Sequence, residues 1–571
     1  MEDKIYDNSN IAESYAGITT PLTFSFARYI YQEVYRHFSR MMGVSNKAIQ
    51  ENEKVFGHMI EFIGYRIYYN LNSWYKMLSF FPAYKISSEF MEKMMGVEKS
   101  NTLKTRRNHS FFQKYFFYSS QAILQTIKIA LVFLTLGWSM EKFSKYFKRV
   151  FSELNTTDLD NLNLSELKSL YETADTKLLA RWKIPIANDF AVMVSAGLAD
   201  KLFKKWLVSD EAYSYMAASV NKPLISLDPG NRMIKIAGLI QYDEKIRELF
   251  LGQFTEEKIL KLLYEKFPTH KITISVRDYL KDFGTRMPNE LKLESETLIE
   301  NPRDFVAIIK KLVRKEAIHK ELPSGQFQDF ALINLAFTRK VFLRWLLRWA
   351  GNSIRRREEA RFYRTLVFGF IRRIFLAIGR KMKQVNTIKN DRDIFYLTIE
   401  EVFDIIVNKK LNVDLASLID QRKDQFKKWQ NIEFPRRIET TKSITELERE
   451  VLNQQLTSQE PLLNKLSGRV ASCPNNMQAF YGVALTLKSF NPSADFLGKI
   501  LVTRQTDPGW TIVFPLLKGV VVERGGMLSH AAIVARELNI PCIVGVEYAT
   551  EVIASGMNIK LDLVNGLIQK L

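Results

Sequence analysis

Apolar residues recur every three or four positions along most of the chain, which places them on one face of an α-helix. In the stretch TTPLTFSFARYIYQEVYRHFSRMMG, Thr20 can cap a helix, Pro21 suits its first position and Gly43 can end it. A second helix start is marked in YLTIEEVF, where Thr398 and Glu401 have the spacing of a capping box. The pattern therefore predicts a large, mainly α-helical fold.

One apolar stretch is long enough to raise the question of a membrane. Residues 122–138, AILQTIKIALVFLTLGW, contain Gln125 and Lys128 within the run. A membrane-spanning helix needs about 18 or more nearly uninterrupted apolar residues. We therefore expect a buried helix here and no stable membrane span, with a span as the minor alternative.

The helical pattern stops at a stretch rich in Ser, Gly, Pro and Asn, NKLSGRVASCPNN, at residues 464–476. Clusters of turn-forming residues of this kind are typical of linkers. We therefore predict a helical domain over residues 1–463, the linker, and a small α/β domain over residues 477–571. The expected fold class is mainly α, with the small α/β domain last.

Short runs rich in β-branched residues predict strands in this last part. The runs are KILVT (Lys499–Thr503), GVVVE (Gly519–Glu523) and CIVGV (Cys542–Val546). The end of the chain, IKLDLVNGLIQKL, holds two alternating runs joined by Asn565 and Gly566. An Asn-Gly pair between alternating runs is a strong signal for a β-hairpin with a type I′ turn.

The composition of the 571 residues is ordinary for a soluble globular protein, with 46% apolar and 25% charged residues. The two cysteines, Cys473 and Cys542, form neither a disulfide framework nor a metal-binding spacing, which fits a reducing cytosol. The polar N-terminus shows no signal peptide, so we expect a cytoplasmic protein. No residues are predicted to bind a metal ion.

The formal net charge of the chain is +20. A charge of this size fits a solvated basic surface, an anionic substrate or an acidic partner. Nucleic acid is a further possibility for any strongly basic chain, but no nucleic-acid-binding motif accompanies the charge here. Nucleic acid is therefore not an expected partner.

The stretch RGGMLSHAAIVARELNIPCIVG contains one of the six histidines, directly after a predicted turn. Gly525 and Gly526 allow positive φ and a close approach of the backbone to another group. Ser529 is a good N-cap, and Asn539 can take the left-handed conformation that ends a helix. His530 is therefore predicted at the first position of a short helix.

A histidine at a helix start has a particular physical setting. The positive end of the helix dipole lowers its pKa, so the imidazole of His530 is expected to stay neutral and nucleophilic near neutral pH. The free amides of the first turn would stabilise a phosphoryl group carried on the ring. On spacing alone, a surface histidine without such a role fits equally well.

The same stretch resembles the phosphohistidine signature of the phosphoenolpyruvate-utilising enzymes, which include phosphoenolpyruvate synthase, pyruvate phosphate dikinase and rifampicin phosphotransferase. The glycine pair, the histidine, the small residues, ARE, IP and the closing glycine all have counterparts, and the preceding VTRQTDPGW is also similar to that family. The resemblance implies that His530 is the phosphorylated residue. Its supporting loop would consist of Arg524, Gly525, Gly526 and Ser529.

The helical part is similar to the substrate-binding domain of rifampicin-phosphotransferase-like proteins. The matching pieces are DNSNIAESYAGITTPLTFSFARYIYQEVYRHF, FGTRMPNELKLES, RRREEARFYRTLVFGFIRRIFLAIGRKM and DIFYLTIEEVF. An arginine fork can hold phosphoryl oxygens, which makes arginines in these pieces candidates for the substrate site. The residues expected there are Arg286, Glu290, Glu358, Arg361 and Arg364. Without the resemblance, residues 355–364 would fit a solvated face with surface ion pairs.

Two departures from the family pattern limit what the resemblance implies. The family usually opens the phosphohistidine domain with a Pro-Gly pair and a glycine four residues later, where this chain has Tyr-Gly at 481–482 and Thr486. That departure concerns the first strand and turn, not His530. Where the family often has Gly-His-Arg or Gly-Asp-Arg, this chain has Gly-Thr-Arg at 284–286, so the identity of the substrate does not carry over.

Complete members of the family begin with an ATP-grasp domain, and phosphoenolpyruvate synthase also has a C-terminal (β/α)₈ barrel of about 250 residues. Met1 lies six residues before DNSNI, and 41 residues follow His530. No GxxxxGK[ST] phosphate-binding loop occurs in the sequence either. We therefore expect neither domain in this chain.

Together, these expectations predict that the chain is the acceptor-binding and phosphocarrier subunit of a split ATP-dependent phosphotransferase. A separate ATP-grasp subunit would phosphorylate His530 from Mg-ATP, and this chain alone would bind no cofactor. Residues 477–571 would then swivel and pass the phosphoryl group to an apolar or aromatic small-molecule acceptor in the helical domain. Two alternatives stay open: a phosphorylation-activated condensing enzyme similar to prodigiosin synthetase, and a non-catalytic phosphohistidine switch or scaffold.

Overall fold

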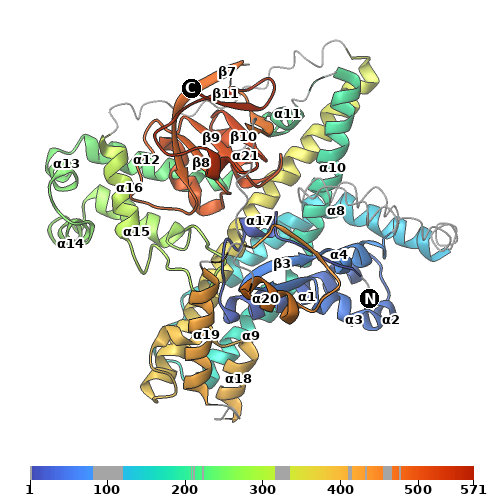
Figure 1. The fold of residues 1–571 in the computed structure, drawn as a ribbon, viewed down its shortest axis with the longest axis horizontal. Coiled ribbons are helices and arrows are strands. Elements are labelled where there is room, and N and C mark those ends of the chain that lie inside the picture. The colour runs from blue at the N-terminus through green and yellow to red at the C-terminus, as the bar shows by residue number, and fades with distance from the viewer. Residues whose placement is uncertain are drawn as a thin grey trace. The chain divides into compact units, whose positions relative to one another are not determined.

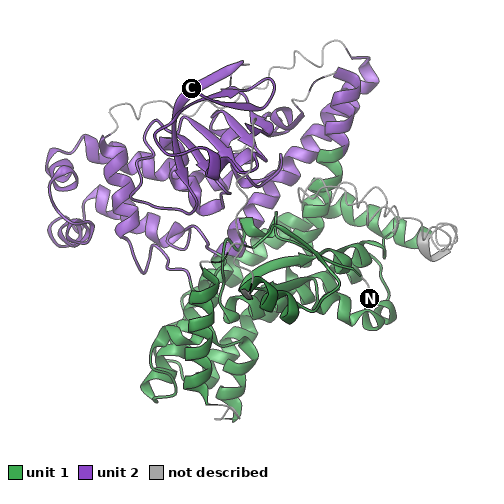
Figure 2. Ribbon diagram, in the orientation of Figure 1, with its two compact units in different colours: residues 1–197, 291–294, 366–458 green, residues 198–290, 295–365, 459–571 purple. Residues whose placement is uncertain are grey.

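The computed structural model describes residues 3–81, 120–207, 212–220, 224–314, 335–408, 414–430, 434–453, 466–474 and 477–571, together with residues 209 and 432. Helices predominate, as the pattern predicts, and two β-sheets accompany them (Figure 1). The chain divides into two compact units (Figure 2). Unit 1 comprises residues 1–197, 291–294 and 366–458, and unit 2 comprises residues 198–290, 295–365 and 459–571.

These units differ from the predicted division at residues 463 and 477. Helical residues 198–290 and 295–365 belong to the same compact unit as the C-terminal α/β part. Two long helices, α10 (Lys183–Leu207) and α17 (Phe337–Gln384), continue from one unit into the other. A change in sequence pattern marks a change in secondary structure, but which segments share a core depends on contacts between distant residues.

Unit 1 combines helices with a small antiparallel sheet. Its helices are α1 (Pro21–Met41), α2 (Asn46–Glu51), α3 (Glu53–Gly57), α4 (Leu71–Leu78), α8 (Ser120–Asn155), α9 (Leu164–Lys177), α18 (Ile399–Asn408), α19 (Leu415–Gln430) and α20 (Ile444–Asn453). Short 3₁₀ turns are η1 (Ile11–Glu13), η2 (Leu179–Arg181) and η5 (Asp391–Tyr396). The sheet has the order β2 (Ile60–Ile63), β3 (Arg66–Asn70), β1 (Lys4–Asp7) and β4 (Arg437–Thr440).

This sheet was not predicted, so the expected fold class, mainly α, fits the first part of the chain only in part. Each strand has only four or five residues, too few for a clear alternating pattern. Strand β1 pairs with β4, Tyr6 opposite Ile438, across more than four hundred residues of chain. Tyr6, Tyr68, Trp429 and Ile438 are buried together beside the sheet, and this aromatic core holds the distant strands in register.

The predicted helix starts in unit 1 are present, with one change at α1. Thr398 and Glu401 form the expected capping box, with N···O distances of 2.8 and 3.3 Å. Helix α1 begins at Pro21, but the hydroxyl of Thr20 does not cap it and instead donates to a carboxylate oxygen of Glu294 at 2.9 Å. The same carboxylate also accepts the backbone N–H of Thr20 at 3.1 Å.

The prediction of a buried helix at residues 122–138 is wrong. Helix α8 contains this stretch, and several of its large apolar side chains are exposed, including Leu134 at 80% and Trp138 at 65%. Only 17% of its most apolar 18-residue window is buried, and by length and composition the helix could cross a membrane. An apolar run in the sequence shows that its side chains favour burial away from water. It does not show whether they are buried by the protein itself or by another partner.

Unit 2 packs helices against a sheet of eight strands. Its helices are α11 (Ala212–Ala218), α12 (Asp228–Gln241), α13 (Glu244–Leu251), α14 (Glu256–Lys266), α15 (Lys271–Phe283), α16 (Arg303–Arg314), the first part of α17, α21 (His530–Glu537) and α22 (Ala549–Val552), with 3₁₀ turns η3 (Ile225–Leu227), η7 (Pro508–Ile512) and η8 (Phe514–Leu516). The strand order is β5 (Leu466–Ser467), β12 (Leu567–Lys570), β11 (Asn558–Asp562), β7 (Ala479–Leu487), β8 (Ile500–Thr503), β9 (Gly519–Val522), β10 (Cys542–Val544) and β6 (Arg469–Ser472).

The central strands β7 to β10 are parallel, and β8, β9 and β10 are buried on both faces. Side chains alternate along β9: Val520 and Val522 join the core shared with the helices of unit 2, and Val521 joins a second core on the other face. The continuous apolar runs in the sequence reflect this two-sided burial. The three predicted strands are confirmed as β8, β9 and β10.

Part of the predicted linker lies in the sheet. Residues 466–467 form β5 and residues 469–472 form β6, which pairs with β10. Gly468 between them donates its N–H to the carbonyl of Gly566 at 2.8 Å. The partners of these short strands lie about 70 to 100 residues further along the chain, so the turn-rich local sequence does not reveal them. Residues 464–465 and 475–476 of the linker fall outside the described residues.

The predicted C-terminal hairpin is confirmed, but its turn is not type I′. Strands β11 and β12 pair with Asp562 opposite Leu567, which leaves a four-residue connection. Gly566 has φ +69, whereas Asn565 is not among the residues with positive φ. The Asp562 carboxylate accepts from the backbone N–H groups of Val564 and Asn565, and these bonds hold the longer turn.

Gly509 on η7 provides a test of the packing in unit 2. A Cβ atom at this position would lie 2.1 Å from backbone atoms of Met287 and Pro288. We expect Gly509→Ala to lower the free energy of unfolding by about 1–3 kcal/mol, because backbone atoms must move apart. Chemical denaturation of the full chain measures this change.

The matched control is Gly238→Ala within α12, where a Cβ atom would meet nothing within 4 Å. Alanine in a helix interior stabilises by roughly 0.5–1 kcal/mol relative to glycine, so this variant should gain stability. A Gly509→Ala variant as stable as the wild type would contradict the close packing of η7 against residues 287–288.

Candidate functional site

The loop between β9 and α21 places His530 at the first position of the helix, as predicted. Gly525 has φ +114, a conformation that favours glycine, and the carbonyl of Gly526 accepts the N–H of Ser529 at 3.0 Å. Ser529 has the extended backbone of an N-cap, but its side chain makes no capping hydrogen bond. Asn539, at φ +52, takes the predicted left-handed conformation after the helix.

His530 is buried, with 1% of its surface exposed. Its Nε2 lies 3.1 Å from the hydroxyl oxygen of Thr511, and its ring packs edge-on against Phe514. The Thr511 hydroxyl donates its single proton to the carbonyl of Pro508 at 2.8 Å. It therefore accepts from Nε2–H, which assigns the neutral tautomer and leaves the lone pair on Nδ1.

The surroundings of His530 favour the neutral imidazole. Burial lowers its pKa well below the ordinary value, and the positive charges of Arg286 and Arg361 lower it further. Nδ1 is buried and has no hydrogen-bond partner among the described residues. An uncharged ring with an available lone pair is the form in which histidine acts as a nucleophile.

Arg286 lies fully buried in the same region of unit 2. Its Nη1 donates to Glu290 at 3.1 Å and to the hydroxyl of Thr365 at 3.2 Å. Its Nε and Nη2 have no hydrogen-bond partner among the described residues. These two groups form one edge of the guanidinium, the edge that can hold two oxygens of a phosphoryl group at once.

The carboxylate beside Arg286 is also buried. Burial raises the pKa of Glu290 above its ordinary range, against the lowering effect of Arg286. Thr365 donates to the same Glu290 oxygen at 2.6 Å. The ion pair thus holds Arg286 in place through one edge and leaves the other edge available.

Helix α17 brings Glu358 and Arg361 to the same part of unit 2. Glu358 is fully buried, and Arg361 donates to it at 3.1 Å. Arg364 lies one turn further on, and its charge acts on Glu290. The interpretation of residues 355–364 as a solvated face is therefore wrong for Glu358, because this side of α17 faces the core of unit 2.

The predicted loop residues divide into two groups. Gly525, Gly526 and Ser529 shape the turn that leads to His530. Arg524 points elsewhere, since its guanidinium donates to Gln505 at 3.5 Å and its N–H to the carbonyl of Arg504.

Three residues of the site were missed by the sequence reasoning: Thr511, Thr365 and Asp507. Asp507 accepts from the backbone N–H of Asn289 at 2.7 Å and of Gly509 at 2.9 Å, which ties η7 to the segment that follows Arg286. The stretch VTRQTDPGW contained the signal, because an acid before Pro-Gly is a common helix cap. Its link to Asn289 needs the tertiary fold.

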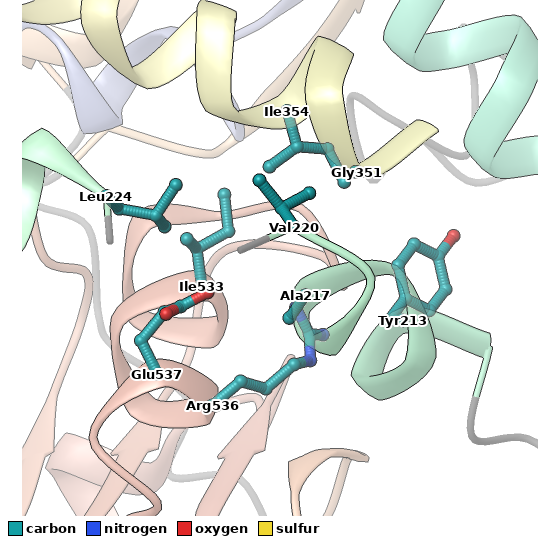
Figure 3. A pocket seen from close by; sticks show the side chains of 9 residues that line it. All are labelled: Tyr213, Ala217, Val220, Leu224, Gly351, Ile354, Ile533, Arg536 and Glu537. Carbon is teal, nitrogen blue, oxygen red and sulfur yellow. The ribbon is translucent and has the colours of Figure 1, made fainter. Parts of the chain in front are cut away.

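A pocket lies along α21 beyond His530 (Figure 3). Ile533 and Glu537 line it and stand three and seven residues after His530, on the same face of the helix. The other lining residues are Tyr213, Ala217, Val220, Leu224, Gly351, Ile354 and Arg536. One aromatic ring is present, so the wall is aliphatic rather than aromatic. Burial raises the pKa of Glu537 to about 7.

Asp507 leads to a prediction on the pH dependence of stability. Burial raises its pKa to about 7, so the folded chain holds this proton while the unfolded chain has lost it between about pH 4 and 7. The contribution of Asp507 to the free energy of unfolding should therefore fall as pH rises through this window, by roughly 2 kcal/mol between pH 5 and 7.5.

Urea unfolding of wild type and Asp507→Asn at both pH values tests this prediction. His530 acts in the opposite direction, because its lowered pKa makes stability rise with pH below about 6.5. Both proteins share that contribution, so it cancels in their difference. An identical pH dependence for the two proteins would show that Asp507 is not protonated in the folded chain.

No group of three or more His, Cys, Asp or Glu side chains able to hold a metal ion occurs in the part of the chain that the structure describes. The described site is instead a neutral imidazole, buried cations and buried carboxyls. These groups suit covalent transfer of an anionic group.

Comparison with known families agrees with this chemistry. Residues 497–566 match the family described as PEP-utilising enzyme, mobile domain, and residues 186–358 match the rifampicin phosphotransferase fourth domain. The first match contains His530, and the second contains Arg286 and Glu358. The chain therefore carries the mobile domain of the phosphoenolpyruvate-utilising enzymes and is a relative of that family, which confirms the resemblance.

Individual relatives point the same way. The rifampicin phosphotransferase of Bacillus cereus is 25% identical over 411 residues, which cover 68% of this chain and 44% of that protein. The Bacillus subtilis protein of that name is 24% identical, covering 72% of this chain and 47% of that protein. A probable phosphoenolpyruvate synthase of Staphylothermus marinus is 48% identical over 71 residues, 12% of this chain and 8% of that protein. The chain spans less than half the length of these relatives. The matches support a role in phosphoryl transfer.

Proposed function

We propose that this chain is the acceptor-binding and phosphocarrier part of an ATP-dependent phosphotransferase, with His530 as the carrier. One observation carries the proposal. A buried, neutral histidine lies close enough to Arg286 for its pKa to be lowered, and Arg286 has two N–H groups with no hydrogen-bond partner among the described residues. A phosphoryl group on the imidazole would supply the missing acceptors.

The first step is phosphorylation of His530. A ring nitrogen attacks the phosphorus of the donor, an N–P bond forms, the P–O bond to the leaving group breaks, and the proton on the other ring nitrogen is released, so that the phosphorylated ring is uncharged. The nitrogen needs its lone pair, which the depressed pKa keeps available at neutral pH. In the tautomer described above that nitrogen is Nδ1, and attack through Nε2 would require release of the Thr511 contact and a proton shift to Nδ1.

The second step transfers the phosphoryl group to an acceptor hydroxyl. The hydroxyl oxygen attacks phosphorus, the N–P bond breaks and the hydroxyl proton ends on the imidazole, which leaves as neutral histidine. Arg286 and Arg361 would balance the negative charge on the equatorial oxygens, the main contribution that a protein makes to phosphoryl transfer.

We place the acceptor in the pocket along α21. Its lining is mainly aliphatic and includes Arg536 and Glu537, and its volume of about 20 Å³ would have to increase to admit a small-molecule acceptor. The relatives named rifampicin phosphotransferase support rifampicin as the first acceptor to try.

The phosphoryl donor in this proposal is Mg-ATP bound by an ATP-grasp protein, expected from the sequence as a separate subunit. Its support is the family resemblance and the names of the relatives. Movement of the mobile domain between that donor and the acceptor pocket would connect the two steps.

The test is a labelling experiment with the full chain, an ATP-grasp partner and ATP carrying radioactive phosphoryl groups. The proposal expects label that is stable in alkali and lost in acid, as an N–P bond requires, and loss of that label to an added acceptor. Alkali-stable label that no acceptor removes would favour the non-catalytic switch. A chain that takes up no label from any ATP-grasp partner would overturn the carrier role.

A further inference from the structure

Helix α8 in unit 1 presents an apolar face to its surroundings. Its exposed large side chains are Ile123 at 55%, Leu124 at 65%, Ile127 at 50%, Leu131 at 56%, Leu134 at 80% and Trp138 at 65%. From Leu124 to Trp138 successive members stand three or four residues apart, and Ile123 stands four residues before Ile127, so they form one stripe along the helix. In Figure 1 this end of α8 extends beyond the other elements of its unit.

The opposite face fixes the helix to unit 1. Leu136, Met140 and Phe143 are buried, and Gln125 donates to the carbonyl of Phe80 at 3.0 Å. Phe143 also packs edge-on against Trp182. The rotation of α8 about its own axis is therefore set by packing, and the apolar stripe is held outward.

The exposed face changes character after Trp138. From residue 141 to residue 149 it carries Glu141 and four basic side chains, Lys142, Lys145, Lys148 and Arg149. Lys142 lies over the Trp138 ring, with its Nζ 5.0 Å from the ring centroid. Along α8 the exposed face is therefore first apolar, then carries a tryptophan, and then carries basic residues. Membrane-bound helices show the same order from the hydrocarbon of a bilayer to its headgroups.

We propose that α8 binds the surface of an anionic phospholipid membrane. The stripe from Ile123 to Trp138 would enter the outer part of the acyl layer, and Lys142 to Arg149 would lie among the anionic headgroups. The +20 charge of the whole chain favours the same partner. Because its other face packs in unit 1, the helix would lie obliquely, with its Ile123 end deeper than its basic end, rather than cross the membrane.

A second copy of the chain fits this face less well. Leu124, Leu131 and Trp138 recur at seven-residue intervals, as in a coiled coil, but helix pairing in water also uses charged side chains beside the stripe. The flanking positions here are Lys128, Ala130, Thr135 and Gly137. One of these four residues is charged, so a partner helix could form few ion pairs beside the stripe. Insertion of the stripe into lipid requires no such ion pairs.

The experiment is co-sedimentation of the full chain with vesicles of phosphatidylcholine, alone or mixed with phosphatidylglycerol. We expect binding to the mixed vesicles and weaker binding to phosphatidylcholine alone. Leu131→Gln/Leu134→Gln should reduce the partition coefficient by about tenfold or more, because each leucine contributes its burial in lipid. Lys145→Gln/Lys148→Gln should reduce binding to the mixed vesicles only.

The matched control is Phe337→Gln/Val341→Gln, an exposed apolar pair on α17 with 80% and 50% exposure. It should bind like the wild type. The proposal is overturned if the α8 leucine variant binds vesicles as well as the wild type, or if the control loses as much. It is also overturned if the wild type binds no vesicles and the leucine variant instead changes the oligomeric state. Circular dichroism confirms that each variant is folded, and none of these readouts depends on phosphotransfer.

Discussion

Replacing His530 with alanine is expected to abolish the acid-labile phosphoryl label on this chain. In the proposed function the N–P bond forms on the imidazole, so removing the ring removes the acceptor of the phosphoryl group. The effect should be complete rather than partial, because the arginines beside His530 stabilise charge but cannot carry the group covalently. Quantifying alkali-stable label after incubation with an ATP-grasp partner and labelled Mg-ATP measures the loss.

Two further variants make this result interpretable. His530→Gln keeps a polar side chain next to Thr511, so it separates loss of the nucleophile from loss of folding in the buried site. His58→Ala removes an exposed histidine that contacts Glu61, and it should label like the wild type. Full labelling of His530→Ala would place the phosphoryl group on another residue.

The parts of this protein that could be predicted from sequence are those decided by near neighbours along the chain. The capping box of Thr398 and Glu401 and the start of α21 at His530 depend on residues within one helical turn. The C-terminal hairpin depends on two adjacent alternating runs. The predicted turn type was wrong because the Asp562 carboxylate, at the end of β11, accepts the N–H groups of Val564 and Asn565 and holds a longer turn.

The parts that could not be predicted depend on contacts over long separations. Strand β6 lies in a turn-rich stretch and is a strand because β10 pairs with it. Helix α8 has a composition typical of a buried helix, yet the packing of unit 1 covers only one of its sides. The sequence shows which side chains favour burial away from water, and the tertiary structure determines whether they are buried within the protein.

The candidate site shows both situations. His530 stands in a continuous signature, so the local sequence alone was enough to select it as the candidate. Arg286, Glu290 and Arg361 were selected from separate pieces, and their meeting around a shared region needed the fold. Thr511 and Asp507 were overlooked because neither residue type is unusual and because their hydrogen bonds to His530 and to Asn289 join segments that are distant in the sequence.

The two arginines are expected to act after His530 has been phosphorylated. Arg361→Gln and Arg286→Lys should each slow transfer from phosphorylated His530 to the acceptor by about 10²–10³-fold, because each removes charge or a two-pronged contact at the phosphoryl oxygens. Phosphorylation itself should remain, since both residues belong to the helical part of unit 2. Lysine at 286 keeps a positive charge beside Glu290, whereas a neutral residue would leave that buried carboxyl unpaired and cost about 3–5 kcal/mol.

Arg348→Gln is the matched control, an exposed arginine on the same helix as Arg361. It should leave both steps unchanged. A readout that needs no acceptor is the ³¹P resonance of phosphorylated His530, which should shift in both site variants and not in the control, because the guanidinium groups alter the electron density at phosphorus. If neither the resonance nor the transfer rate changes in the two site variants, the phosphoryl group does not meet Arg286 and Arg361. The acceptor must then be sought away from the pocket along α21.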